Sequence, residues 1–342
     1  MGFRSGNAWA PDKLSLMTDT ATKLALLFPG QGSQTVGMGR ALYDASPAAR
    51  AIFEEADHAL GFPLSDIIFN GPEDTLKLTE HTQPAILTVS IATLRVLEPE
   101  LKSRNLAIAF AAGHSLGEYS AHVAAHTLSF ADAVRTVRAR GQFMQSAVPA
   151  GEGAMAAILG LPAPQINDIC ARVSSDLNQP VSPANLNSPD QTVISGTLQA
   201  VEAAAALCKE AGAKRTVMLP VSAPFHCALM QPAQDQLATQ LESIPFADPT
   251  FPVAANVDAR LLTRGTEVRD ALIRQVTSSV RWVECIQLLQ QSGVTNFIEV
   301  GPGKVLTGLN RQIDRALSTT NVEDPTSLEK TLAALNETNT NS

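Results

Sequence analysis

The sequence predicts an α/β protein, in which a parallel sheet is covered by helices and a smaller subdomain is inserted. Short aliphatic and β-branched runs alternate with long Ala-rich stretches of helical period. Residues 24–28, 106–111 and 297–300 are predicted strands, and a Gly-containing turn and a helix follow each of them. This alternation is typical of parallel sheets, because their strands need crossover helices.

One segment departs from this alternation and predicts the inserted subdomain. Between residues 150 and 221 the predicted order is strand, helix, strand, strand, helix, strand, which is the order of a ferredoxin-like unit. We therefore expect a larger α/β domain made of residues 21–149 and 222–316, with a ferredoxin-like subdomain at 150–221. A ligand is expected in the cleft between the two bodies.

Both ends of the chain are expected to lie outside this fold. Residues 1–20 lack the continuous apolar stretch of a signal peptide and are predicted to be a disordered extension. From residue 317 the chain becomes rich in Ser, Thr and Asn, so residues 317–342 are predicted to be a polar C-terminal tail.

Composition excludes several classes of partner. The 342 residues include 25 Lys and Arg against 33 Asp and Glu, a net charge of −8, so no global positive field attracts nucleic acid or an anionic membrane. No run approaches the roughly 18 apolar residues of a membrane span. The four cysteines are far apart and form no C-x-x-C pair, which argues against a zinc site and a disulfide-built secreted domain. A reducing cytoplasm is the expected location.

A candidate nucleophile lies in the run Gly113–Gly117, which has the pattern G-x-S-x-G between an apolar strand and a helix. The glycines permit a sharp turn that exposes the Ser115 hydroxyl, and the helix N-terminus offers N–H groups to a developing oxyanion. A five-residue pattern also recurs by chance, so an ordinary strand-to-helix turn remains an alternative.

A serine nucleophile needs a base, and His226 is the best placed of the six histidines. It follows a predicted strand in the loop PVSAPFHCALM, and rigid Pro-containing loops often carry catalytic side chains. A histidine among apolar residues is nevertheless more often a packed core residue, so that alternative stays open.

Arg140 is a candidate anion-binding residue in the predicted helix 130–148. Phe143 and Met144 follow it at i+3 and i+4, so its guanidinium is expected in partly apolar surroundings where a bidentate carboxylate contact is strong. The alternative is a solvated basic face, which suits Arg135 and Arg138 better. Glycine turns at residues 30–34 and 301–304 lack the nucleotide-binding fingerprints but could present N–H groups near the serine.

Six strings resemble one known family, the malonyl-CoA:acyl carrier protein transacylases of fatty-acid synthesis. They are FPGQGSQ (28–34), TQPA (82–85), GHSLGEYSA (113–121), RGQFMQ (140–145), APFHCALM (223–230) and EVGPGKVLTGL (299–309). The resemblance implies an α/β-hydrolase-like large domain with a ferredoxin-like small one. It also implies ping-pong transfer of malonyl from malonyl-CoA to acyl carrier protein by a monomer, with no cofactor and no metal.

The resemblance implies a role for eight residues. These are the catalytic pair Ser115 and His226, the oxyanion-hole N–H groups of Gln31 and Leu116, the substrate-binding side chains Arg140, Met144 and Asn185, and Gln275, whose backbone carbonyl would orient the His226 ring. The chain departs from the family pattern at Ser279, where proline is usual.

Two other functions are compatible with parts of this pattern. A lipase or esterase shares G-x-S-x-G, but the chain has no HGGG-type oxyanion loop. The chain order also argues against this class, which expects an acidic residue between the serine and a late histidine. A catalytically silent module that binds carrier protein is the other alternative, and the intact serine, histidine and arginine argue against it.

Overall fold

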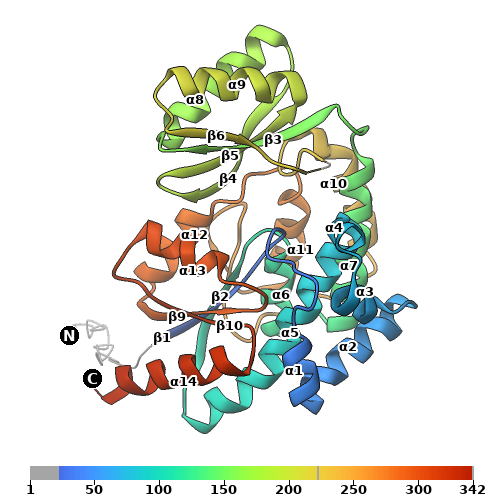
Figure 1. Ribbon diagram of the computed structural model, residues 1–342, viewed down its shortest axis with the longest axis vertical. Helices are drawn as coiled ribbons and strands as arrows, with labels where there is room; N and C mark the ends of the chain where they lie inside the picture. Colours follow the sequence, from blue (N-terminus) through green and yellow to red (C-terminus); the bar gives the residue numbers. More distant parts are fainter. Residues whose placement is uncertain (1–22, 222, 341–342) are drawn as a thin grey trace, which may run out of the picture.

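The fold consists of two β-sheets, each covered by helices (Figure 1). The structure is a computed structural model that describes residues 23–221 and 223–340. Within that part of the chain, no helix combines the length and the apolar character needed to cross a membrane. The predicted extension at residues 1–20 lies outside the described residues.

The larger sheet has six strands in the order β10-β9-β1-β2-β7-β8. All neighbours pair in parallel except β7 and β8, which are antiparallel. The strands are β1 Lys23–Phe28, β2 Ile108–Gly113, β7 Val253–Ala254, β8 Leu261–Leu262, β9 Val294–Val300 and β10 Ser318–Val322.

Helices cover both faces of this sheet, which is why β1 is apolar along almost its whole length. Leu24, Leu26 and Phe28 pack into the core on one face, and Ala25 and Leu27 pack into a second core on the other. The first core includes α1 Arg40–Ala45, α2 Pro47–Leu60, α3 Leu64–Asn70, α4 Glu73–Lys77, α5 Thr79–Ser103, α6 Gly117–Ala124, α7 Phe130–Ser146, α10 Gln231–Leu241, α11 Gly265–Arg274 and α14 Pro325–Thr340. The second includes α12 Trp282–Gln291 and α13 Val305–Ile313.

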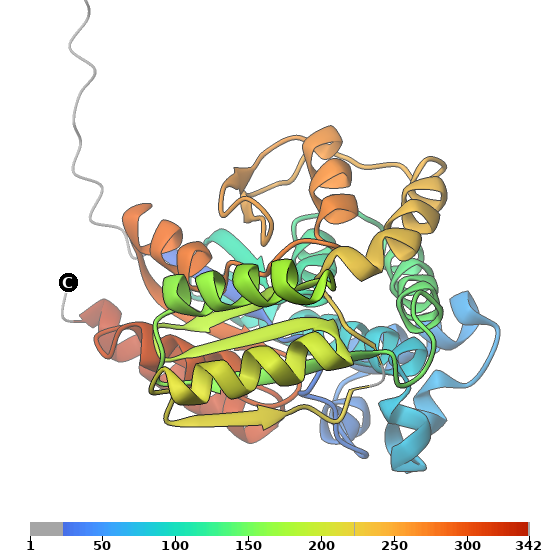
Figure 2. The ribbon, with the colours of Figure 1, turned by 90° about the horizontal axis from the view of Figure 1, so that it is seen from above.

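The smaller sheet is antiparallel, with the order β4-β5-β3-β6. Its strands are β3 Gly153–Leu159, β4 Val181–Ser188, β5 Gln191–Thr197 and β6 Arg215–Met218. Helices α8 Ala163–Leu177 and α9 Leu198–Glu210 lie side by side on one face of it (Figure 2). The predicted α/β class with a βαββαβ subdomain is therefore confirmed, while the division at residues 150 and 221 stays a prediction.

The C-terminal segment differs from the polar tail expected for residues 317–342. Residues 318–322 form the edge strand β10, and α14 follows it. Val322, Leu332 and Leu335 enter the first core, and Asp324 caps the start of the helix by accepting a hydrogen bond from the Ser327 N–H at 2.7 Å. The side chains of β10 are mostly half-buried and its last residue is buried, so most of its sequence can stay polar.

The two sheets are joined by backbone contacts at the edge strand β4. The Leu186 N–H donates to the Val280 carbonyl at 2.9 Å, and the Val280 N–H donates to the Ala184 carbonyl at 2.8 Å. The Ser279 hydroxyl adds a 2.6 Å hydrogen bond to the Pro183 carbonyl. Serine at the position where proline is usual therefore has a partner on the small sheet.

The turn between β2 and α6 leaves no room for side chains at its two glycines. A Cβ atom on Gly117 would lie 2.1 Å from the Phe28 carbonyl oxygen, and one on Gly113 would lie 1.9 Å from the Gly117 carbonyl carbon. The turn is therefore packed directly against the backbone of β1.

We expect Gly117→Ala to lower the free energy of unfolding by about 3 kcal/mol or more, because backbone atoms must move to admit the methyl group. Gly308→Ala, in α13, is the matched control, since a Cβ there meets nothing within 4 Å. It should leave stability unchanged or raise it by up to about 1 kcal/mol. Urea unfolding followed by circular dichroism measures both, and equal stability of the two variants would contradict the close packing.

Candidate active site

Ser115 lies at the tip of the turn between β2 and α6, in a left-handed conformation with φ of 51°. Such a conformation is costly for a residue with a side chain, so the surroundings must hold it. Asn256 does so from the segment after β7. Its Oδ1 accepts a hydrogen bond from the Ser115 N–H at 2.7 Å, and its Nδ2 donates to the Gly113 carbonyl at 2.7 Å.

His226 is in position to act as a base toward Ser115. Its Nε2 lies 2.7 Å from the Ser115 Oγ, and its Nδ1 lies 2.9 Å from the backbone carbonyl oxygen of Gln275. A carbonyl oxygen can only accept, so the proton of the neutral ring is on Nδ1 and Nε2 is free to accept the serine proton. Burial, and next the nearby charge of Arg140, lower the pKa of His226 to about 3.

Arg140 is a buried cation whose hydrogen-bond partners are all neutral, and only 2% of its surface is exposed. Its NH1 donates to the Gln83 Oε1 at 2.8 Å, and its NH2 donates to the Gln275 Oε1 at 2.9 Å and to the Ser115 Oγ at 3.2 Å. Tyr119 places its ring centroid 5.7 Å from the guanidinium carbon. Burial lowers the pKa of Arg140, and an anionic ligand would compensate this charge.

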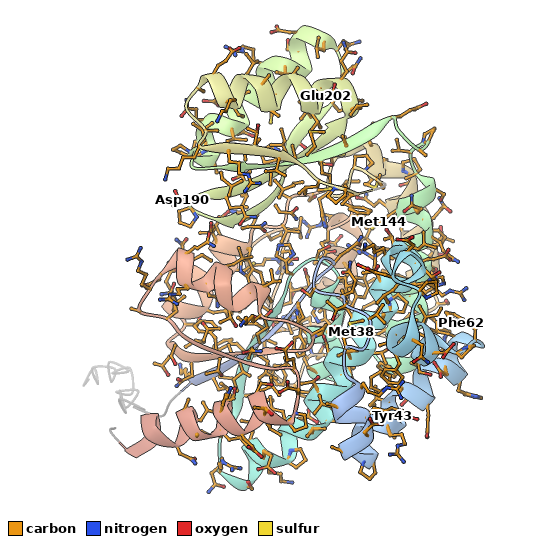
Figure 3. All side chains as sticks on the ribbon, viewed as in Figure 1. Met38, Tyr43, Phe62, Met144, Asp190 and Glu202 are labelled. Carbon is orange, nitrogen blue, oxygen red and sulfur yellow. The ribbon has the colours of Figure 1, made fainter. Side chains whose placement is uncertain are left out.

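These groups face one cavity of about 560 Å³ between the two sheets. Seven of the eight predicted site residues line it: Gln31, Ser115, Leu116, Arg140, Met144, Asn185 and His226. Met144 lies where the two bodies meet (Figure 3). The small sheet contributes Met155 and Asn185 to the wall, and Lys77 lines it from the large body.

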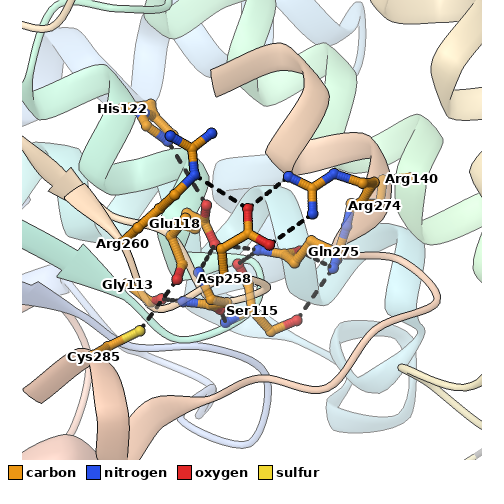
Figure 4. A network of polar contacts seen from close by, with 12 residues as sticks. Gly113, Ser115, Glu118, His122, Arg140, Asp258, Arg260, Arg274, Gln275 and Cys285 are labelled. Atoms are coloured by element: carbon orange, nitrogen blue, oxygen red, sulfur yellow. Dashed lines mark hydrogen bonds and ion pairs between the residues drawn. The ribbon is translucent and has the colours of Figure 1, made fainter. Parts of the chain in front are cut away.

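Gln275, the eighth residue, contacts the site from behind the cavity wall. Besides its carbonyl bond to His226, its Nε2 donates to the Ser115 carbonyl at 3.0 Å and to the Glu118 Oε2 at 2.7 Å (Figure 4). The turn at residues 301–304 contributes nothing to the described cavity lining, whereas Gly32 of the other glycine turn does.

Three polar residues of the site were not predicted. Gln83 and Glu118 lie inside the strings TQPA and GHSLGEYSA, which carry the family resemblance, but the resemblance assigned no role to either residue. Asn256 follows a two-residue strand and has no local pattern that marks it. His114 lines the cavity as well, and its Nε2 lies 2.8 Å from the Asn187 Oδ1.

Comparison with known proteins supports the resemblance in the sequence. The family described as the acyl transferase domain matches residues 25–331. A malonyl CoA-acyl carrier protein transacylase of Bacillus subtilis (strain 168) is 50% identical over 320 residues, covering 94% of this chain and 99% of the relative.

Solved structures agree with this match. A malonyl CoA-acyl carrier protein transacylase from Coxiella burnetii is 42% identical with a TM-score of 0.88, covering 91% of this chain and 97% of that one. A malonyl-transacylase in complex with a type II polyketide synthase acyl-carrier protein is 46% identical with a TM-score of 0.87, covering 92% and 100%. The chain therefore belongs to the acyl transferase domain family, as a member of its malonyl CoA-acyl carrier protein transacylases.

Proposed function

We propose that this chain moves the malonyl group from malonyl-CoA to the phosphopantetheine thiol of acyl carrier protein, through a malonyl ester on Ser115. One observation carries the proposal: a serine hydroxyl contacts both a correctly oriented histidine and a buried arginine in one cavity. The first pair suits nucleophilic attack on a thioester, and the arginine suits an acyl group that ends in a carboxylate.

In the first half-reaction the His226 Nε2 takes the Ser115 proton as Oγ attacks the thioester carbonyl carbon. The resulting oxyanion accepts hydrogen bonds from the N–H groups of Gln31 and Leu116. Leu116 precedes the first residue of α6, and N–H groups at a helix start lack partners within the helix. Collapse of the tetrahedral intermediate breaks the carbon–sulfur bond. His226 gives its proton to the sulfur, so CoA leaves as the thiol.

The second half-reaction runs these steps in reverse with the thiol of the carrier protein. His226 takes the thiol proton, the thiolate attacks the malonyl ester, and the proton returns to the Ser115 oxygen as it leaves. Both thiols use the same base and the same oxyanion donors, which is why one serine and one histidine suffice for a ping-pong reaction.

Arg140 selects the acyl group in this proposal. The guanidinium offers two parallel N–H donors to the malonyl carboxylate, and an acetyl group has no charge to pair with it. Met144 and Asn185 line the same cavity and limit its shape.

The proposal places the chain in the cytoplasm, where the malonyl group on acyl carrier protein supplies fatty-acid synthesis. All four cysteines are buried free thiols, as expected in a reducing compartment. A monomeric state stays a prediction.

We expect Ser115→Ala to abolish formation of the malonyl-enzyme, because no other nucleophile touches His226 Nε2 in the described structure. Intact mass after incubation with malonyl-CoA measures this, and wild type should gain one malonyl group. Ser103→Ala, at the exposed end of α5, is the control and should gain it too. A stoichiometric malonyl adduct on the Ser115→Ala variant would refute the assignment.

We expect Arg140→Ala to lower kcat/KM for malonyl transfer at least tenfold and to lower acetyl transfer much less. A charge-assisted hydrogen-bonded pair contributes roughly 1.5–3 kcal/mol, and about 1.4 kcal/mol corresponds to tenfold. Arg135→Ala is the control, because Arg135 is half exposed and pairs with Asp132. Equal losses for malonyl-CoA and acetyl-CoA would make Arg140 a structural residue.

We expect kcat/KM for malonyl transfer to stay flat from about pH 8 to about pH 5. The pKa of His226 is lowered from 6.5 to about 3, so the free enzyme keeps a neutral base well below pH 6.5. The same shift means that the contribution of His226 to stability is full above pH 6.5 and is lost as the pH falls toward 3. Circular dichroism over this range controls for acid unfolding, and a rate that halves near pH 6.5 would contradict the shift.

A further inference from the structure

Glu118 is a fully buried carboxylate directly behind the Ser115 turn, and the mechanism above gives it no role. Its Oε2 accepts hydrogen bonds from the Gln275 Nε2 at 2.7 Å and from the Asn256 N–H at 3.0 Å (Figure 4). Its Oε1 has no hydrogen-bond partner among the described residues, and the His122 Nε2 lies 3.9 Å from it. Burying a carboxylate is costly, so this position needs an explanation.

The contacts of Gln275 fix the orientation of its side-chain amide. A carboxylate can only accept hydrogen bonds, so the NH2 end of the amide must face Glu118. The oxygen end must then face the other way, where Arg140 donates to it at 2.9 Å. A flipped amide would place its NH2 group against the guanidinium, where two donors would meet.

Gln275 is also the residue whose backbone carbonyl accepts from His226. One residue therefore contacts the base through its main chain and the anion-binding arginine through its side chain. Glu118 holds that side chain. It also accepts a hydrogen bond from the N–H of Asn256, the residue whose side chain holds the Ser115 turn.

We propose that Glu118 is a positioning residue, which orients the Gln275 amide so that its oxygen holds the Arg140 guanidinium in place for the malonyl carboxylate. This inference rests on the proposed function. The competing explanation is purely structural, because an acidic residue in the first turn of a helix also stabilises that helix.

Glu118→Gln is the informative variant, because it keeps the volume and one acceptor oxygen but removes the charge. We expect it to lower kcat/KM for malonyl transfer about tenfold, since a charge-assisted hydrogen bond is about twice as strong as a neutral one. Acetyl transfer should fall less, because it does not use the Arg140 guanidinium. Glu299→Gln is the matched control: Glu299 is a buried carboxylate that accepts bonds at the start of α13, and its loss should leave the malonyl-to-acetyl ratio unchanged.

A double-mutant cycle with Gln275→Ala tests whether Glu118 acts through Gln275. Gln275→Ala removes the amide and keeps the backbone carbonyl, so in that background Glu118→Gln should not lower the malonyl-to-acetyl ratio any further. Losses that multiply, an unchanged single variant, or an equal fall for malonyl and acetyl transfer would each overturn the inference. A wild-type enzyme that transfers another acyl group and no malonyl would overturn the proposed function instead, and the same cycle measured with that group would still test the coupling.

Discussion

The constraint on which the site depends is a buried cation beside a base that must stay neutral. The Arg140 guanidinium and the His226 ring share the Ser115 hydroxyl, so the charge acts directly on the base. Burial and this charge together lower the pKa of His226. A carboxylate placed directly on Arg140 would relieve the base but would also occupy the position of an anionic substrate. Neutral acceptors, the amide oxygens of Gln83 and Gln275, hold the guanidinium without neutralising it.

The fold meets this constraint by bringing separate segments to one edge of the parallel sheet. Ser115 follows β2, and Asn256 follows the neighbouring strand β7, so both lie at the carboxyl ends of adjacent strands. Gln275 follows directly after α11, which allows its carbonyl to accept a hydrogen bond from a side chain. The small sheet completes the cavity wall, and its backbone contact at Val280 fixes its place on the larger body.

Local sequence patterns predicted the parallel sheet and the Ser115 turn, because each depends on neighbours in the chain. The roles of Gln83, Glu118 and Asn256 could not be predicted in this way. A buried amide or carboxylate is defined by which donors surround it, and those donors come from distant segments. The edge strand at residues 318–322 was missed for a related reason, since its polar side chains are mostly half-buried and its pairing with β9 is tertiary.

Neutral acceptors around Arg140 have a further consequence for the proposed reaction. In the free enzyme, burial and next the charge of Arg140 keep the pKa of His226 low, so the base is neutral but weak. A malonyl carboxylate on Arg140 cancels much of that charge and removes one cause of the low pKa, while burial remains. A malonyl carboxylate bound as proposed would therefore raise the pKa of His226 from its low value in the free enzyme, and a higher pKa makes a stronger base for proton transfer. In the proposed reaction an acetyl group would bring no charge and would leave the base weak, so Arg140 would favour malonyl through the chemical step as well as through binding.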